Sequence, residues 1–253
     1  MPLVQVTAAD YDSYLLDFEI VPRALEAGQP GRVRFFVRQP GSGAIVRRFE
    51  VVHERIFHLF VLSHDLEYFA HIHPVLQLDG TLEVALLVPR PGPYQMVADF
   101  MPLGAPPQLV QRSFVTAGYA GSLIAPATGL RLDSQDKVVD ETRVKLTMPD
   151  AFAGREQLVT FDLNDVATGS PVTDLEPYLG ASGHLLLVSA DLAEAHHSHP
   201  VAEISKASGP TVVFQVMFPS TGAYRMWAQF QRGGKVLTAS FTVPVGASLA
   251  ARQ

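Results

Sequence analysis

The stretch His71-Ile72-His73-Pro74 recurs 126 positions later as His197-Ser198-His199-Pro200. A third histidine recurs at the same offset, His58 as His184. Six of the nine histidines therefore occupy matched positions. An internal repeat is the first feature to establish in a sequence, because missing it leads to the wrong fold.

The match extends well beyond these histidines. Residues 28–74 align with 154–200 without a gap, and after a four-residue length difference residues 89–96 align with 219–226. A unit of about 125 residues is an ordinary domain size and is too long for one solenoid repeat, which runs roughly 20–50 residues. We therefore predict two complete domains. Their expected limits are residues 1–120 and 130–253, with a linker over 121–129 that is small, apolar and interrupted by proline.

Composition narrows the classes of partner. The chain has 253 residues, 47% of them hydrophobic, and a formal net charge of −6 with 19 scattered Lys and Arg. Scattered basic residues in an acidic chain argue against nucleic acid and anionic membranes as partners. No run approaches the roughly 18 apolar residues of a spanning helix, so we expect no membrane insertion. No charged segment precedes an apolar one at the start of the chain, so nothing in the sequence marks it for export.

The chain contains no cysteine. Disulfides, thiolate nucleophiles and cysteine-ligated metal sites are therefore all excluded.

Short apolar and alternating runs, separated by turn signals roughly every 8–12 residues, are typical of a β-sandwich. The expected strands of the first domain are Leu15–Val21, Gly31–Arg38, Phe57–Leu62, Ala70–Val75, Thr81–Val88, Tyr94–Phe100 and Gln111–Thr116. Those of the second are Arg143–Met148, Gln157–Leu163, His184–Ser189, His197–Val201, Thr211–Phe218, Tyr224–Phe230 and Thr238–Val245. Seven strands per domain predict an all-β protein of two tandem immunoglobulin-like β-sandwich domains, derived from an internal duplication. Single helical turns are compatible with Ser63–Phe69 and Ser189–Ala195.

Local geometry brings the recurring histidines together if the hairpin register places His58 on the same face as His71 and His73. A hairpin across residues 63–69 places His58 opposite the His71–His73 stretch, and facing residues of an antiparallel pair have Cβ atoms about 4.5–5.5 Å apart. His71 and His73 share one face because side chains alternate along a strand. The same holds for His184, His197 and His199, whereas His196 should point to the opposite face.

Three neutral imidazoles suit Cu(II), Zn(II) or Ni(II) and leave one coordination position open. Met96 and Met226, which recur two residues after a recurring tyrosine, are candidates for a fourth contact. With such a thioether the site would hold copper in either oxidation state. We therefore expect copper, with zinc or nickel as alternatives, at a site made from His58, His71, His73, His184, His197, His199, Met96 and Met226.

Other interpretations remain open. Histidines on a β face commonly hydrogen-bond to the backbone inside a core, and the methionines fit a packed sheet surface equally well. Clustered imidazoles are also suited to a pH switch. If the histidines are structural, the tandem domains would be a non-metal interaction module that presents a surface to another protein. A cupin-like metalloenzyme is a further alternative, although a cupin places glutamate shortly after His-x-His, where this chain has Gln77 and Leu78.

Several segments of the second domain carry a resemblance to a known family. They are Leu175–Leu185, His197–Pro200 and Tyr224–Gly234, and they resemble bacterial immunoglobulin-like domains, often exported, of which some occur beside heavy-metal-binding modules. The resemblance implies an extracytoplasmic role in handling metals, with copper favoured, and it supports His184, His197 and His199 as ligands. The first domain departs from the pattern at Val51–Arg55 and Phe57, which favours the second site over the first.

The sequence thus predicts a transition-metal-binding protein that acts in sequestration, delivery or sensing. An enzymatic function is not the expectation, and the cellular location is not fixed by the residues.

Overall fold

The computed structural model describes residues 13–21, 23–123, 130–201 and 210–247, and its regular elements are all β-strands. The chain divides into two compact units, Met1–Val61 with Ala70–Gly121 and Leu62–Phe69 with Ser122–Gln253. The segments Ser63–Phe69 and Ser189–Ala195, compatible with helical turns by sequence, form tight turns instead. Within the described part of the chain, no helix has the length and apolarity that crossing a membrane requires. Most of the predicted linker, residues 124–129, lies outside the described residues.

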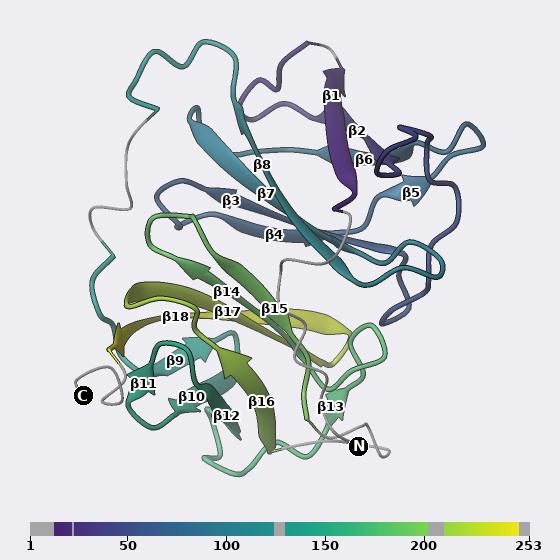
Figure 1. Ribbon diagram of the computed structural model, residues 1–253. Helices are drawn as coiled ribbons and strands as arrows, with labels where there is room; N and C mark the ends of the chain where they lie inside the picture. Colours follow the sequence, from purple (N-terminus) through teal and green to yellow (C-terminus); the bar gives the residue numbers. More distant parts are fainter. Residues whose placement is uncertain (1–12, 22, 124–129, 202–209, 248–253) are drawn as a thin grey trace. The chain divides into compact units, whose positions relative to one another are not determined.

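The first sandwich consists of two four-stranded sheets (Figure 1). One has the order β1 (Leu15–Val21), β2 (Gly31–Arg38), β6 (Leu82–Leu86) and β5 (Val75–Leu76). The other has the order β4 (Phe69–Ile72), β3 (Phe57–Ser63), β7 (Pro93–Phe100) and β8 (Gln108–Val115). The chain passes between the sheets after β2, β4 and β6, as expected for an immunoglobulin-like sandwich.

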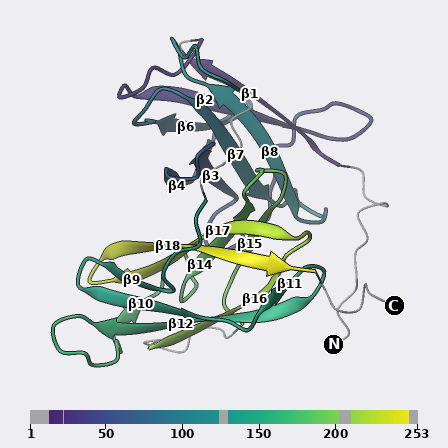
Figure 2. The ribbon, with the colours of Figure 1, turned by 90° about the vertical axis from the view of Figure 1, so that its left-hand side faces the viewer.

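The second sandwich repeats this arrangement. One sheet has the order β16 (Thr211–Met217), β12 (Glu156–Asp165), β10 (Thr142–Thr147) and β9 (Asp136–Val139). The other has the order β11 (Ala151–Phe152), β18 (Lys235–Gly246), β17 (Gly222–Arg232), β14 (His184–Ser189) and β15 (Ala195–Ser198), with β13 (Leu175–Glu176) also paired to β17. Figure 2 shows these two layers edge-on. The predicted all-β fold of two immunoglobulin-like sandwiches is therefore confirmed.

Two predicted strands end earlier than expected. The strands that carry the His-x-His pairs stop at Ile72 and Ser198, rather than at Val75 and Val201. Proline has no N–H to donate to a sheet ladder, so Pro74 and Pro200 limit these strands. His73 and His199 consequently lie just beyond the strand ends. The sequence also missed four short strands, β5, β9, β11 and β13.

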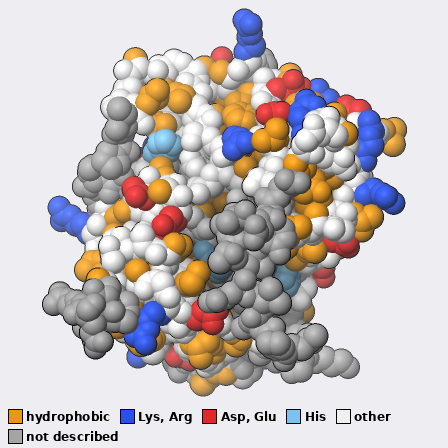
Figure 3. Space-filling view, in the orientation of Figure 1, with side chains coloured by type: hydrophobic (Ala, Val, Ile, Leu, Met, Phe, Trp, Pro, Cys, Tyr) orange, Lys and Arg blue, Asp and Glu red, His pale blue; other side chains and the backbone are white. Residues whose placement is uncertain are grey.

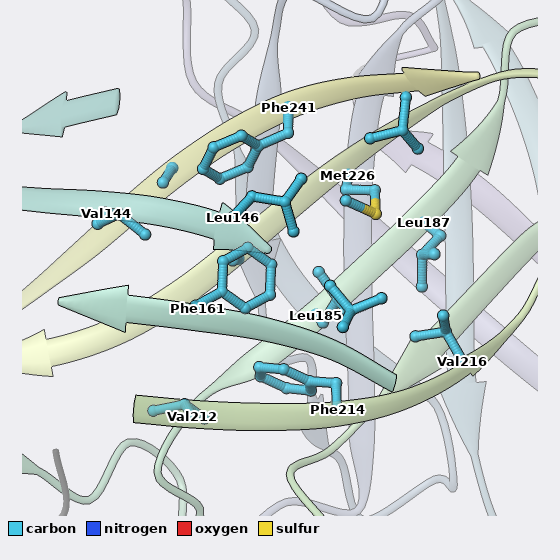
Figure 4. Packing of buried hydrophobic residues seen from close by; sticks show 14 of the residues in the cluster. Val144, Leu146, Phe161, Leu185, Leu187, Val212, Phe214, Val216, Met226 and Phe241 are labelled. Atoms are coloured by element: carbon cyan, nitrogen blue, oxygen red, sulfur yellow. The ribbon is translucent and has the colours of Figure 1, made fainter. Parts of the chain in front are cut away.

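The core of the second sandwich is formed by alternate residues of both sheets (Figure 4). Phe161 on β12 contacts Phe241 on β18 at a ring separation of 5.6 Å and Phe230 on β17 at 5.7 Å. In the first sandwich Phe35 on β2 and Phe57 on β3 are 5.6 Å apart. Truncating such a buried aromatic ring to alanine typically costs 3–5 kcal/mol, so these rings fix which face of each strand is interior.

Each sandwich also has a tyrosine corner, the hydrogen bond from a tyrosine hydroxyl to the backbone a few residues upstream. The hydroxyl of Tyr94 donates to the carbonyl of Arg90 at 2.8 Å, and that of Tyr224 lies 3.2 Å from the carbonyl of Ser220. These corners form at the Pro-x-x-Gly turns that recur in the sequence, as expected for a structural role.

Charged side chains of both signs are interspersed on the face drawn in Figure 3. In the first sandwich, for example, Arg34 pairs with Glu19, Asp79 and Glu83.

Candidate metal centre

Two groups of three histidines form, one in each sandwich: His58 with His71 and His73, and His184 with His197 and His199. Within each group one ring nitrogen per residue lies within 4.8 Å of the others. The first member of each group is almost fully buried, with 2% of His58 and 1% of His184 exposed, while the other members are partly buried.

The hairpin register explains why these rings meet. In the second sandwich Leu185 pairs with Ser198 and Leu186 with His197, so the next pair in the same register would be His184 with His199. Side chains alternate along a strand, so His184, Leu186 and His197 share one face. Leu185 and Leu187 point the other way, into the core. His196 pairs with Leu187, which puts it on the opposite face from the cluster, as predicted.

The distances are close to those that a shared metal ion requires. The Nδ1 of His58 lies 3.1 Å from the Nε2 of His71, and the equivalent distance between His184 and His197 is 3.3 Å. Two nitrogens bound tetrahedrally to one zinc-like ion at 2.0–2.1 Å would be roughly 3.3 Å apart. The third rings, His73 and His199, lie edge-on to the first at ring separations of 5.0 Å and 4.9 Å. The first two nitrogens of each group are therefore spaced as they would be on a common ion.

A backbone carbonyl orients the buried histidine in each group. The Nε2–H of His58 donates to the carbonyl oxygen of Val52 at 3.0 Å, and that of His184 donates to the carbonyl of Tyr178 at 2.9 Å. A carbonyl only accepts, so in the neutral ring the proton is on Nε2 and the lone pair is on Nδ1. This lone pair points at the neighbouring histidine. Metal-ligating histidines commonly make such a contact through their second nitrogen.

Burial favours the neutral form of two histidines of the first cluster, because it lowers the pKa of His58 and of His73. It lowers the pKa of His73 to about 4, with further lowering by His58 and Arg55. Burial also lowers the pKa of His58, partly offset by the Val52 carbonyl and by Asp99. The Nε2 of His73 is buried without a hydrogen-bond partner. Neutral imidazole is the form that binds metal ions, so these rings are ready to do so at neutral pH.

Aromatic side chains flank the clusters. The ring of Phe60 stacks on His71 at 4.2 Å, and the ring of Tyr178 lies edge-on to His184 at 5.2 Å. These contacts restrict the rotation of the imidazoles.

The two methionines do not belong to the clusters, and the prediction that they make a fourth contact is corrected here. Met226 lies in the core of the second sandwich near Leu187 and Phe241 (Figure 4). It pairs with Leu187 in the register of β14 and β17, whereas His184 pairs with Gln229 and points to the other face.

Met96 is oriented in the same way. It shares a face of β7 with Phe100, four residues on, which stacks on the core ring of Phe57 at 5.1 Å. His58, the residue after Phe57, points to the opposite face. Both methionines therefore fill the interior.

Sequence reasoning missed the two carbonyl groups. Val52-His53-Glu54-Arg55 and Tyr178-Leu179-Gly180-Ala181 share no residue, so the repeat gives no signal for them. Only Leu179-Gly180 carries the composition of a turn. Because the first domain departs from the family pattern at Val51–Arg55, the sequence favours the second site over the first. The backbone of the first domain nevertheless makes the same carbonyl contact to its buried histidine as that of the second.

These features define a class, a tandem immunoglobulin-like β-sandwich protein with a buried three-histidine group in each sandwich. The chain belongs to the family described as "Domain of unknown function (DUF8832)", which matches residues 9–113 and 137–247. No curated protein matches the sequence.

Solved structures with similarity to this chain include several bacterial proteins. The Escherichia coli adhesin FdeC is 12% identical with a TM-score of 0.29, and the match covers 93% of this chain and 66% of the adhesin. Invasin, a bacterial integrin-binding protein, is 14% identical with a TM-score of 0.28, covering 92% of this chain and 40% of invasin. The fibronectin(III)-like modules of Clostridium thermocellum CbhA are 11% identical with a TM-score of 0.26, covering 94% and 97%.

Proposed function

We propose that this protein binds transition-metal ions, one at each three-histidine group, for sequestration, delivery or sensing. The observation that carries the proposal is the convergence of three imidazole nitrogens within 4.8 Å in both sandwiches. Leucine or valine would fill the same volume without polar atoms, so three buried or half-buried rings at one point cost stability unless something binds them.

Copper is the metal that we favour. With the methionines in the core, the donor set is imidazole nitrogen alone, which suits copper, zinc and nickel rather than magnesium or calcium. Nitrogen sites bind Cu(II) most tightly among the divalent first-row ions. Three protein ligands leave a coordination position open, and an open position allows an ion to pass to or from a partner site.

Metal analysis of protein purified without an affinity tag tests the proposal. We expect about two equivalents of metal per chain after exposure to Cu(II) or Zn(II), and anomalous scattering at the copper and zinc edges would identify the ion taken from cells. The double variant His184→Ala with His199→Ala should retain about one equivalent.

The matched control is His196→Ala, which removes a histidine next to His197 on the opposite strand face. It should retain both equivalents. A protein that takes up no metal beyond background would rule the proposal out, as would equal losses in the control and the double variant.

A further inference from the structure

A two-residue turn precedes the buried histidine of each cluster by the same spacing. In the first sandwich Val52 and Arg55 exchange both backbone hydrogen bonds, at 2.9 Å and 3.1 Å. The residues between them, His53 and Glu54, have φ angles of 49° and 62°. Two positive φ angles in a two-residue hairpin define a type I′ turn.

The second sandwich builds the same turn from different residues. Tyr178 and Ala181 exchange hydrogen bonds of 2.8 Å and 3.1 Å, and Leu179 and Gly180 between them have φ angles of 52° and 72°. Left-handed backbone is unfavourable at a residue such as leucine, because its Cβ comes too close to the following carbonyl oxygen. Both copies therefore keep the turn, although its residues differ and Leu179 disfavours a positive φ.

The first residue of each turn uses its carbonyl oxygen twice. The carbonyl of Val52 accepts the turn hydrogen bond from Arg55 and the Nε2–H of His58, six residues on. The carbonyl of Tyr178 accepts from Ala181 and from His184 in the same way. Each turn thus holds a carbonyl rigidly against the second nitrogen of the buried histidine.

Building on the proposed function, we infer that the turns Val52–Arg55 and Tyr178–Ala181 are positioning elements that make His58 and His184 bind the metal through Nδ1. Their neighbours His71 and His197 bind through Nε2, the atom that faces those lone pairs. The result is a mixed Nδ1 and Nε2 donor set in both sites.

A change of tautomer at the neighbouring histidine follows from this geometry. With the proton of His58 held on Nε2, its Nδ1 can only accept, so the Nε2 of His71 carries a proton in the metal-free protein. A metal ion needs that Nε2 lone pair. The Nε2 proton of His71 therefore passes to solvent as its Nδ1 takes one up, with no net proton released. His58 keeps its tautomer throughout.

Zn(II) is a suitable probe because it is diamagnetic, and NMR of protein labelled with ¹⁵N-histidine reports the tautomer of each ring. In metal-free protein at neutral pH we expect His58, His184, His71 and His197 all as Nε2–H tautomers. On saturation with Zn(II), His58 and His184 should remain Nε2–H with coordinated Nδ1, while His71 and His197 should change to Nδ1–H with coordinated Nε2.

Turn variants test the positioning role. Glu54→Pro forces a negative φ where the turn needs a positive one, and we expect Zn(II) affinity at the first site to fall 10–100-fold, the usual effect of losing a contact that orients a ligand. Glu54→Gly, the matched control, accepts the positive φ and should change affinity less than about threefold. Gly180→Pro and Gly180→Asn make the same comparison in the second sandwich.

The outcomes separate the two proposals. Zn(II) bound with His58 and His184 in the Nδ1–H form would overturn this inference and leave the metal-binding proposal intact. The same holds if the proline variants bind Zn(II) as tightly as the glycine and asparagine variants. Wild-type protein that binds no Zn(II) would overturn both.

Discussion

A buried imidazole has two ring nitrogens that need polar partners. In the two most buried histidines of this chain, both nitrogens have one. His58 and His184 each donate one N–H to a backbone carbonyl and turn the other nitrogen toward a second histidine. An unsatisfied polar group at this depth would cost about 1–3 kcal/mol. The contacts therefore offset the free-energy cost of burying the ring. They also direct the Nδ1 lone pair toward the neighbouring histidine.

The depressed pKa of His73 predicts acid sensitivity of the metal-free protein. Its folded pKa is about 4, against 6.5 for an ordinary histidine. Between these values the unfolded chain binds a proton that the folded chain does not, so the free energy of unfolding falls as the pH is lowered through this window. From about pH 7 to about pH 5 the expected loss from this residue is on the order of 2 kcal/mol.

Urea unfolding of chelator-treated protein at the two pH values measures this loss. His73→Gln, which cannot titrate, should show a smaller loss than wild type. Equal losses in the two proteins would show that His73 is not the source.

The core position of Met226 predicts that it has no part in metal binding. Met226→Leu nearly conserves volume, so we expect the free energy of unfolding to change by less than about 1.5 kcal/mol. Copper and zinc affinities should match those of wild type, because the side chain lies on the opposite sheet face from His184. Isothermal titration calorimetry of the variant checks this, and a tenfold weaker affinity would return Met226 to the ligand set.

At the scale of the element, the hairpins β3–β4 and β14–β15 each bring an isolated histidine to a His-x-His pair. The turns that close them are held by carboxylates. The carboxylate of Asp191 accepts from the hydroxyl of Ser189 at 2.6 Å and from the backbone of Ala193 at 3.0 Å, and Asp65 makes equivalent contacts with Ser63 and Glu67. Fixing the turn fixes the register, and a slip of one residue would move every histidine to the other face.

The two tyrosine corners predict unequal effects of the same substitution. Tyr94→Phe removes a hydrogen bond to a carbonyl and should cost about 1 kcal/mol of unfolding free energy. The single hydroxyl proton of Tyr224 goes mainly to the carboxylate of Glu194, the shortest of its contacts, and burial together with this contact raises the pKa of Tyr224. Hydrogen bonds to charged groups contribute about 1.5–3 kcal/mol, so Tyr224→Phe should cost more. Chemical denaturation of both variants measures the difference, and an equal or reversed order would contradict this account.

The strands also show which features of the fold could not be predicted from the sequence. Period-two patterns and turn residues predicted β1 and β2 to the residue, since a strand with one buried face has a clear alternation. The bounds of β14 were also predicted to the residue, although this strand is buried along its whole length and its short apolar run does not alternate. Strands of two residues, such as β11 and β13, carry no pattern. The recurrence of histidine identified the members of both three-histidine groups. The face occupied by the methionines, in contrast, depends on the register between β14 and β17, which the sequence of one strand does not contain.

At the scale of the whole molecule, the two three-histidine groups share a backbone geometry and differ in their surroundings. The first has Phe60, Arg55 and Asp99 near its rings, whereas the second has Leu186, Ala181 and Gln229 at the matching positions. The proposed domain limits, residues 1–120 and 130–253, assign one site to each half of the chain.

Two sites predict a stepwise response of stability to metal. An ion that binds only the folded state stabilises it by about 2.7 kcal/mol when its free concentration is 100 times Kd. Zn(II) should therefore raise the melting temperature of the full chain, and a chelator should reverse the rise.

His71→Ala with His73→Ala should abolish the response of the first sandwich alone, and His184→Ala with His199→Ala should abolish that of the second. Differential scanning calorimetry follows both, with His196→Ala as the variant that should respond like wild type. A metal-dependent rise that survives in a chain carrying all four alanines would place the binding elsewhere, because no imidazole pair would then remain in either cluster.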